Sequence, residues 1–167
     1  MTVKDLAIEL GLWDDINQHV RAFDAANAPK LLQQLAELPV KRSHATRRLG
    51  SYVSRDGQPH SIRLQFAQEP ENLKQTLLHE IAHLCDHLTS PKATRRGHGP
   101  RWKAWATALG INVKSCGESE ALAQLQQQRL KLVAVCQKCG AEFKRIRRLS
   151  RGRRYYHTEC GGVLRRV

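Results

Sequence analysis

Residues 77–87 read LLHEIAHLCDH, and the fold of the chain is best predicted outward from this stretch. Side chains at positions i and i+4 of a helix are neighbours, so His79 and His83 can reach a single metal ion. Glu80 lies close enough to a water molecule at that ion to act on it without binding the metal. The pattern H-E-x-x-H is typical of two zinc ligands and a general base.

The sequence around this motif predicts one amphipathic helix over residues 70–88. Pro70 suits the first turn of a helix, and Ser90-Pro91 ends it. His79 and His83 lie on the flank roughly opposite an apolar stripe that we expect to face the core. The stripe consists of Leu73, Leu77, Ile81, Leu84 and Leu88.

A catalytic zinc site needs a third protein ligand and an open position for water. His87 lies about 12 Å from His79 along a straight helix, which is too far for both to bind one ion easily. We therefore expect His87 to be a surface or supporting residue. His98, in RRGHGPRW, is flanked by two glycines that let the backbone approach closely, and it is the predicted third ligand.

Three of the five cysteines lie near the C-terminus and predict a second zinc site. Cys136-x-x-Cys139 is followed eighteen residues later by His157-x-x-Cys160, which is the ligand spacing of a zinc ribbon. Sites with three cysteines and one histidine are ordinary for structural zinc. Cys85 and Cys116 have no partner at ligand spacing, and we expect them to be small buried residues.

The other predicted elements follow from turn and breaker residues. We expect helices over residues 3–37, with a break near 27–29, over 101–109 and over 115–128. A hairpin is predicted over 46–66 around Asp56-Gly57, a loop over 89–100, and short strands over 131–135, 142–146 and 153–157. The sequence thus predicts an α+β chain with two domains, residues 1–128 and a small basic zinc ribbon at 129–167.

The positive charge is concentrated in the ribbon segment. The chain carries a net charge of +13, and residues 129–167 contain twelve Lys and Arg residues but only two Glu residues. Such a segment suggests a polyanion such as DNA, bound without sequence preference, although a merely solvated surface is the alternative. The candidate nucleic-acid contacts are Arg145, Arg147, Arg148, Arg151, Arg153, Arg154, Tyr155 and Tyr156.

HEIAHLCDH followed by RRGHGPRW resembles the SprT-like family of zinc metallopeptidases, over about residues 40–167. This family includes the Spartan proteases, which cut proteins crosslinked to DNA. The resemblance implies a zincin-like domain with a small antiparallel sheet and a catalytic zinc at His79, His83 and His98. It also implies Glu80 as the general base and a terminal zinc ribbon, from which this chain departs at His157.

The leading hypothesis is a zinc metalloprotease with two zinc ions, one catalytic and one structural. It would bind DNA and cleave DNA-bound or DNA-crosslinked proteins, in the cytoplasm at the nucleoid, with no membrane partner. The alternative is a non-proteolytic zinc-ribbon factor that binds nucleic acid in transcription and keeps the peptidase-like domain as a scaffold. Glu80 favours the enzyme, because a scaffold does not need a base.

Overall fold

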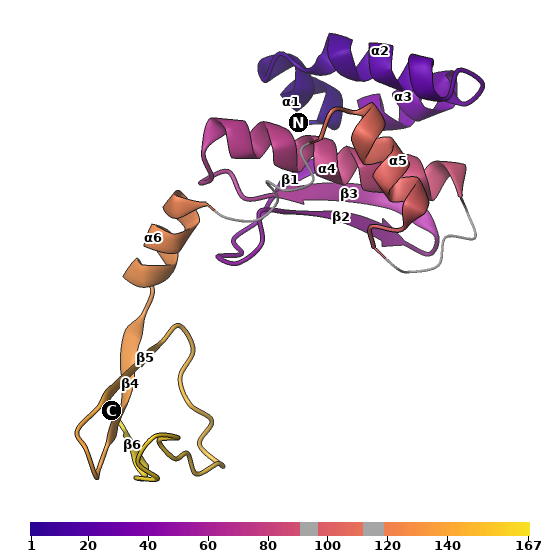
Figure 1. Cartoon of the computed structure of the whole chain (residues 1–167). Coiled ribbons are helices and arrows are strands. Elements are labelled where there is room, and N and C mark those ends of the chain that lie inside the picture. The colour runs from indigo at the N-terminus through magenta and orange to yellow at the C-terminus, as the bar shows by residue number, and fades with distance from the viewer. Residues whose placement is uncertain (91–96, 112–118) are drawn as a thin grey trace. The chain divides into compact units, whose positions relative to one another are not determined.

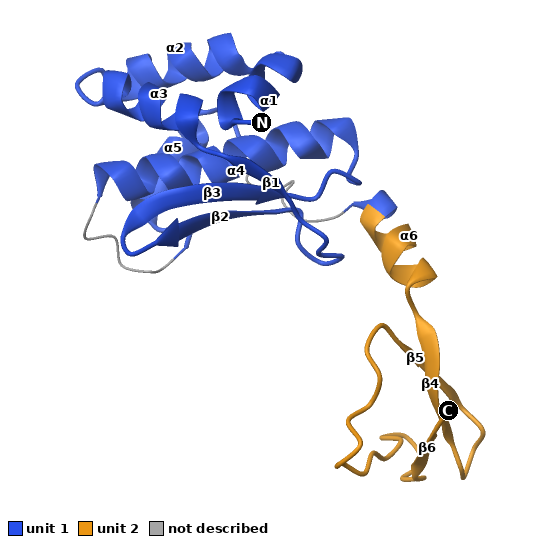
Figure 2. Cartoon of the chain, turned by 180° about the vertical axis from the view of Figure 1, so that it is seen from behind, with its two compact units in different colours: residues 1–121 blue, residues 122–167 orange. Residues whose placement is uncertain are grey.

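The computed structural model of the chain describes residues 1–90, 97–111 and 119–167. The chain divides into two compact units, residues 1–121 and residues 122–167 (Figure 2). Helices and two small sheets make it an α+β protein, as expected. The domain boundary expected after residue 128 stays a prediction. Within the described ranges, no helix is long and apolar enough to cross a membrane.

The first unit begins with three helices, α1 (Val3–Glu9), α2 (Trp13–Phe23) and α3 (Ala28–Glu37). The break before α3 lies where the sequence predicted it. The break between α1 and α2 was not expected, because residues 3–27 were predicted to form one helix. Gly11 explains it: its φ of +69° is left-handed and follows the last turn of α1.

A three-stranded sheet follows, with strands β1 (Val40–Arg42), β2 (Gly50–Arg55) and β3 (Gln58–Leu64) in the order β1-β3-β2. The predicted hairpin is confirmed, since β2 and β3 pair antiparallel around the turn at Asp56-Gly57. The expectation of a purely antiparallel sheet is wrong, because β1 pairs parallel with β3. The hairpin places β2 on one edge of β3, so β1 pairs at the other edge. There β1 runs in the same direction as β3.

The long helix α4 (Pro70–Thr89) lies between this sheet and the N-terminal helices (Figure 1). Its predicted stripe does face the core: Leu77, Ile81 and Leu84 are fully buried, while Leu73 and Leu88 pack against the core at its edge. Glu80 and Cys85 are buried as well. Because α4 is covered on both sides, it is buried over more of its circumference than one stripe.

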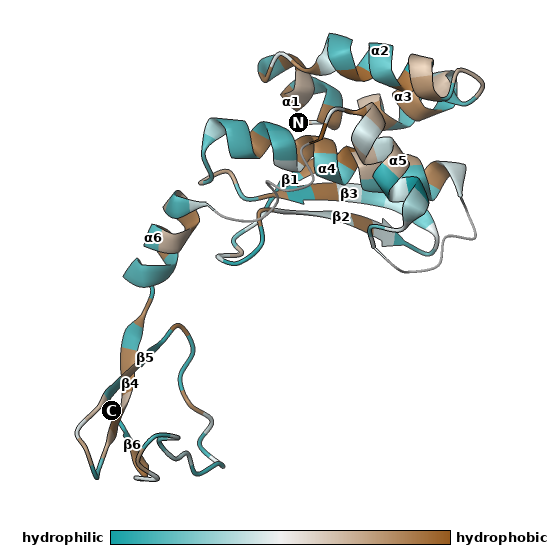
Figure 3. Ribbon diagram, in the orientation of Figure 1, coloured by the Kyte–Doolittle hydropathy of each residue, from teal (hydrophilic) through white to brown (hydrophobic). Residues whose placement is uncertain are grey.

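Hydrophobic residues recur among hydrophilic ones along α2 and α4, as expected of helices that bury some sides and expose others (Figure 3). Helix α5 (Pro100–Ala108) packs against α4 and α2 and ends just before Gly110, the predicted stop. Phe23 of α2 and Trp105 of α5 are in ring contact, with centroids 4.5 Å apart. Residues 91–96 of the predicted loop lie outside the described residues.

The second unit is a small sheet with strands β4 (Lys131–Cys136), β5 (Glu142–Arg145) and β6 (Leu164–Arg166), in the order β5-β4-β6 and antiparallel throughout. Helix α6 (Glu120–Gln128) precedes it, and the first residues of the predicted helix, 115–118, lie outside the described part. The buried core of this second unit consists of Val133, Ala134 and Leu149.

The strands predicted at 131–135 and 142–146 are confirmed, but the strand predicted at 153–157 is wrong. There only Tyr156 forms an isolated bridge, with Val163, and the third strand is β6. The physical reason is the turn that follows, in which the Gly161 N–H donates to the His157 carbonyl at 2.8 Å. That turn brings His157 beside the cysteines and ends any extended run.

Candidate metal centres

Helix α4 places His79 and His83 side by side, one turn apart, with ring centroids separated by 5.0 Å. His98 approaches the pair from the segment 97–99 that leads into α5. Its φ of +66° is left-handed, a conformation uncommon outside glycine, and turns its ring toward α4. The Nε2 atoms of His98 and His79 are 3.0 Å apart.

These three residues are called the histidine cluster below. Their candidate ligand nitrogens all lie within 4.8 Å of one another. A tetrahedral zinc ion with bonds of about 2.0–2.1 Å would separate two such nitrogens by about 3.3 Å, which is close to the 3.0 Å between those of His79 and His98. The donor set therefore fits zinc. His87 is not part of the cluster; its ring contacts Tyr52 and the Gly57 carbonyl instead.

Trp102 of α5 supports the histidine cluster. Its ring centroid lies 4.8 Å from that of His79, 5.2 Å from His83 and 4.1 Å from His98. The side chain is only 1% exposed, so the core holds it in place. The cluster thus has a rigid aromatic wall, and small rotations of the three imidazoles are restricted.

Burial keeps the helix histidines neutral. It lowers the pKa of His79 to about 4, with the neighbouring His98 adding to the effect. Burial likewise lowers the pKa of His83 to about 4, helped by His79 and His98. Neutral imidazole is the form that binds metals, so both side chains are ready to bind a cation at pH 7.

Glu80 lies beside the cluster with its side chain 5% exposed. Burial raises the pKa of Glu80 to about 7, while a hydrogen bond from the Tyr52 backbone opposes the rise. The Tyr52 N–H donates to Oε2 of Glu80 over 2.6 Å. This contact was not predicted, because a backbone donor leaves no trace in the sequence. A carboxyl group with a pKa near neutrality can both accept and return a proton.

The second group, called the ribbon cluster below, consists of Cys136, Cys139, His157 and Cys160. Nδ1 of His157 is 3.2 Å from the sulfur atoms of both Cys139 and Cys160. The sulfur of Cys160 is 3.5 Å from those of Cys136 and Cys139. Zinc–sulfur bonds of about 2.3 Å produce separations only slightly longer, so this cluster also fits a tetrahedral ion.

Two residues next to the ribbon cluster, Gly162 and Glu159, favour metal binding there. A Cβ atom on Gly162 would lie 2.5 Å from the Cys136 sulfur, so only glycine allows the backbone to pass there. The second ring nitrogen of His157, Nε2, lies 3.5 Å from a carboxylate oxygen of Glu159. A carboxylate at that position favours the tautomer in which Nδ1 is free to bind metal.

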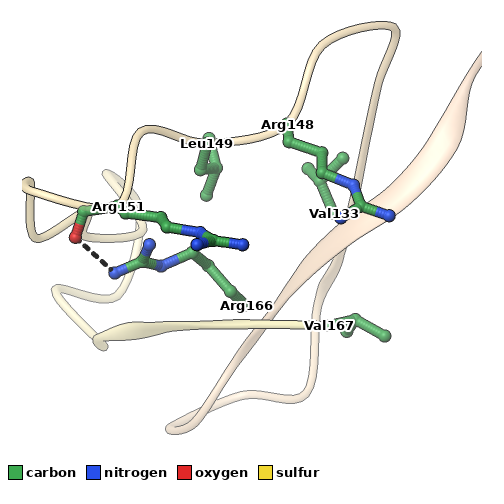
Figure 4. Close-up of a pocket in the computed structure, with 6 residues that line it drawn as sticks. All are labelled: Val133, Arg148, Leu149, Arg151, Arg166 and Val167. Atoms are coloured by element: carbon green, nitrogen blue, oxygen red, sulfur yellow. Dashed lines mark hydrogen bonds between the residues drawn. The ribbon is translucent and has the colours of Figure 1, made fainter.

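The other predicted residues are spread over the second unit. All six candidate arginines are exposed, as is Tyr156, whereas Tyr155 packs against the small core and its hydroxyl accepts a hydrogen bond from the Ser150 N–H. Arg148 and Arg151 line an open depression of about 430 Å³ together with Arg166, which was not on the predicted list (Figure 4). Cys85 is buried as predicted, and Cys116 lies outside the described residues.

A family model described as SprT-like family matches residues 17–129, which is more than half of the chain. The matched range contains the histidine cluster and Glu80 but ends before Cys136. A search of curated proteins found no match.

The first prediction concerns the number of metal ions. We expect two zinc equivalents per chain, one in each cluster. His83→Ala should lose one equivalent and Cys139→Ser the other, because the two clusters share no ligand. Elemental analysis of the purified proteins measures this directly. One equivalent or none in the unaltered protein would contradict one of the two sites.

The second prediction concerns the metal-free protein in acid. An unfolded chain protonates its histidines near pH 6.5, whereas folded His79 and His83 take up protons only near pH 4, so their contribution to stability is lost across that window. Glu80 acts oppositely: its folded pKa of about 7 exceeds the usual 4.5, so it stabilises the fold below neutrality. Glu80→Gln removes the stabilising contribution of Glu80 and leaves the destabilising contribution of the two histidines.

With a chelator present, Glu80→Gln should therefore lose more thermal stability between pH 6.5 and 4.5 than the unaltered protein does. Tryptophan fluorescence reports on this part of the chain, because Trp13, Trp102 and Trp105 all lie in the first unit. Equal losses in the two proteins would show that Glu80 does not titrate as a buried group.

Proposed function

The chain belongs to the SprT-like family, and from this premise we propose that it is a zinc-dependent peptidase directed to proteins on DNA. The family indicates a metalloprotease-like domain. Beyond the family, we propose that the domain is a zincin-type peptidase and that it acts at DNA. The observation that supports it most is a buried carboxyl group with a pKa of about 7 on Glu80, the residue that follows His79 in the helix that supplies two of the three convergent imidazoles.

The chemistry follows from the residues of this site. Zinc bound there would polarise a peptide carbonyl group and acidify a water molecule. His79, His83 and His98 would hold the ion as neutral ligands and leave it a full double charge. Glu80 would accept the proton of the attacking water and return it to the leaving amine, and the Tyr52 N–H keeps one carboxylate oxygen in place for this.

The proposal that DNA is the partner rests on the second unit. In the depression of Figure 4, the side chains of Arg151 and Arg166 run alongside each other, and one Arg166 nitrogen donates to the Arg151 carbonyl over 3.0 Å. No ion pair involving the lining arginines is present among the described residues. Neighbouring guanidinium groups without an acidic partner favour an anion between them, and a phosphodiester suits this geometry.

The third prediction concerns the cleavage of a DNA-bound protein, which tests the proposed activity. A protein crosslinked to an oligonucleotide should be cleaved by the zinc-loaded protein, and Glu80→Gln should lose at least about a hundredfold in rate, since general base catalysis contributes about 10²–10⁴. The same substrate protein without its oligonucleotide should be cut more slowly than the crosslinked one, because binding of enzyme and substrate to one DNA raises the local substrate concentration. The stimulation should fade as salt rises.

The same assay separates the alternatives. Tight DNA binding without cleavage by the unaltered protein would favour the non-proteolytic nucleic-acid-binding factor. Cleavage that is indifferent to DNA would leave the peptidase and remove the proposed direction to DNA. Equal cleavage by Glu80→Gln would show that the products come from a contaminating protease.

The fourth prediction concerns the arginines of β6. Successive side chains of a strand point to opposite faces, and Arg166 lines the depression of Figure 4 whereas Arg165 does not. Arg166→Gln should weaken oligonucleotide binding and lower the salt dependence by about one phosphate contact. Arg165→Gln is the matched control, with the same loss of charge. If both variants bind alike, the depression makes no specific contribution.

A further inference from the structure

Tyr52 connects Glu80, the proposed general base, to His87, a second residue of the same helix. Glu80 and His87 lie about two turns apart on α4 and therefore on the same side of it. Tyr52 of β2 contacts both residues. Its backbone N–H lies 2.6 Å from Oε2 of Glu80, and its hydroxyl lies 2.6 Å from Nδ1 of His87.

The direction of each hydrogen bond follows from the partners. The other ring nitrogen of His87, Nε2, is 3.0 Å from the Gly57 carbonyl, which can only accept. Nε2 therefore carries the hydrogen in the neutral ring, and Nδ1 accepts the hydrogen of the Tyr52 hydroxyl. Burial raises the pKa of the Tyr52 phenol, so the hydroxyl keeps its proton at neutral pH. A single imidazole thus joins both Tyr52 and the hairpin turn to α4.

The strand that carries Tyr52 approaches α4 very closely. A Cβ atom on Gly50 would lie 2.9 Å from Oε1 of Glu80 and 2.5 Å from Cγ2 of Thr76, so only glycine permits this distance. β2 is also the edge of its sheet. One side of β2 has no neighbouring strand in the part of the chain that the structure describes, and the Tyr52 N–H donates to Glu80 of α4. The position of Glu80 therefore depends on how firmly β2 is held against the helix.

We propose that Tyr52 and His87 form a positioning pair, which holds the edge strand β2 against α4 and so fixes the Glu80 carboxylate. Neither residue touches the substrate in this role; both act through the Tyr52 backbone. The proposal rests on the peptidase function proposed above. Without the pair, β2 would keep its packing against α4 and the backbone hydrogen bond to Glu80 but would lose the side-chain contact that joins it to the helix, and the carboxylate would sample unproductive orientations.

The test uses Tyr52→Phe, His87→Ala and the double variant in the full-length, zinc-loaded protein. Each single variant should lower kcat by about five- to tenfold, the effect of one neutral hydrogen bond, with KM and zinc content unchanged. The double variant should lose no more than His87→Ala alone, because that variant has already lost the contact with the Tyr52 hydroxyl. His87→Asn, whose Oδ1 can accept from Tyr52, should restore part of kcat. His19→Ala, an exposed histidine of α2, is the control.

A second readout does not depend on activity. Amide hydrogen exchange at Tyr52, measured by NMR, should become about tenfold faster in His87→Ala and Tyr52→Phe but not in His19→Ala. Unchanged exchange and unchanged kcat would overturn the positioning role, and so would additive losses in the double variant. If the unaltered protein cleaves nothing, the proposed function fails, while the exchange experiment still decides whether the pair holds β2.

Discussion

The carboxylate of Glu80 is buried between α4 and β2, where it accepts a hydrogen bond from the Tyr52 backbone. Removing an ionisable group from water costs free energy, and one backbone donor offsets only part of that cost. The result is a pKa near 7 instead of the usual value for a glutamic acid. Two structural conditions maintain this state: α4 is packed on both sides, and Gly50 lets β2 come within contact distance. The two helix histidines lie one turn apart on this same packed helix, on either side of Glu80 in the sequence.

Much of this site could be predicted from sequence because its determinants are local. The i, i+4 spacing of His79 and His83 fixes their geometry once residues 70–89 are helical, and the apolar stripe makes the helix certain to pack. His98 could be identified from its place between two glycines after the helix, but the left-handed φ falls on His98 itself and not on Gly97 or Gly99. The ribbon cluster could be identified from local spacing too, since ligands paired three positions apart, as Cys136 with Cys139 and His157 with Cys160, define tight turns.

The remainder depends on contacts between distant segments. β1 has three residues, too few to show an alternating pattern, and its parallel pairing joins it to a strand 22 positions further along the chain, Val40 opposite Ile62. Tyr155 and Tyr156 resemble a strand in sequence, yet the turn at His157 prevails over local β propensity. The hydrogen bonds from Tyr52 to Glu80 and His87 join residues 28 and 35 positions apart, and one donor is a backbone group. No spacing rule anticipates such contacts.

Binding of one zinc ion by three histidines beside Glu80 underlies the proposed chemistry. Anomalous diffraction at the zinc absorption edge, from crystals of the zinc-loaded protein, would locate this ion. We expect a peak bonded to His79, His83 and His98 at about 2.0–2.1 Å, with the Glu80 carboxylate next to it but not bound to it. A peak bonded to His87 in place of His98, or no peak at the histidine cluster, would show that the proposed zinc site is wrong.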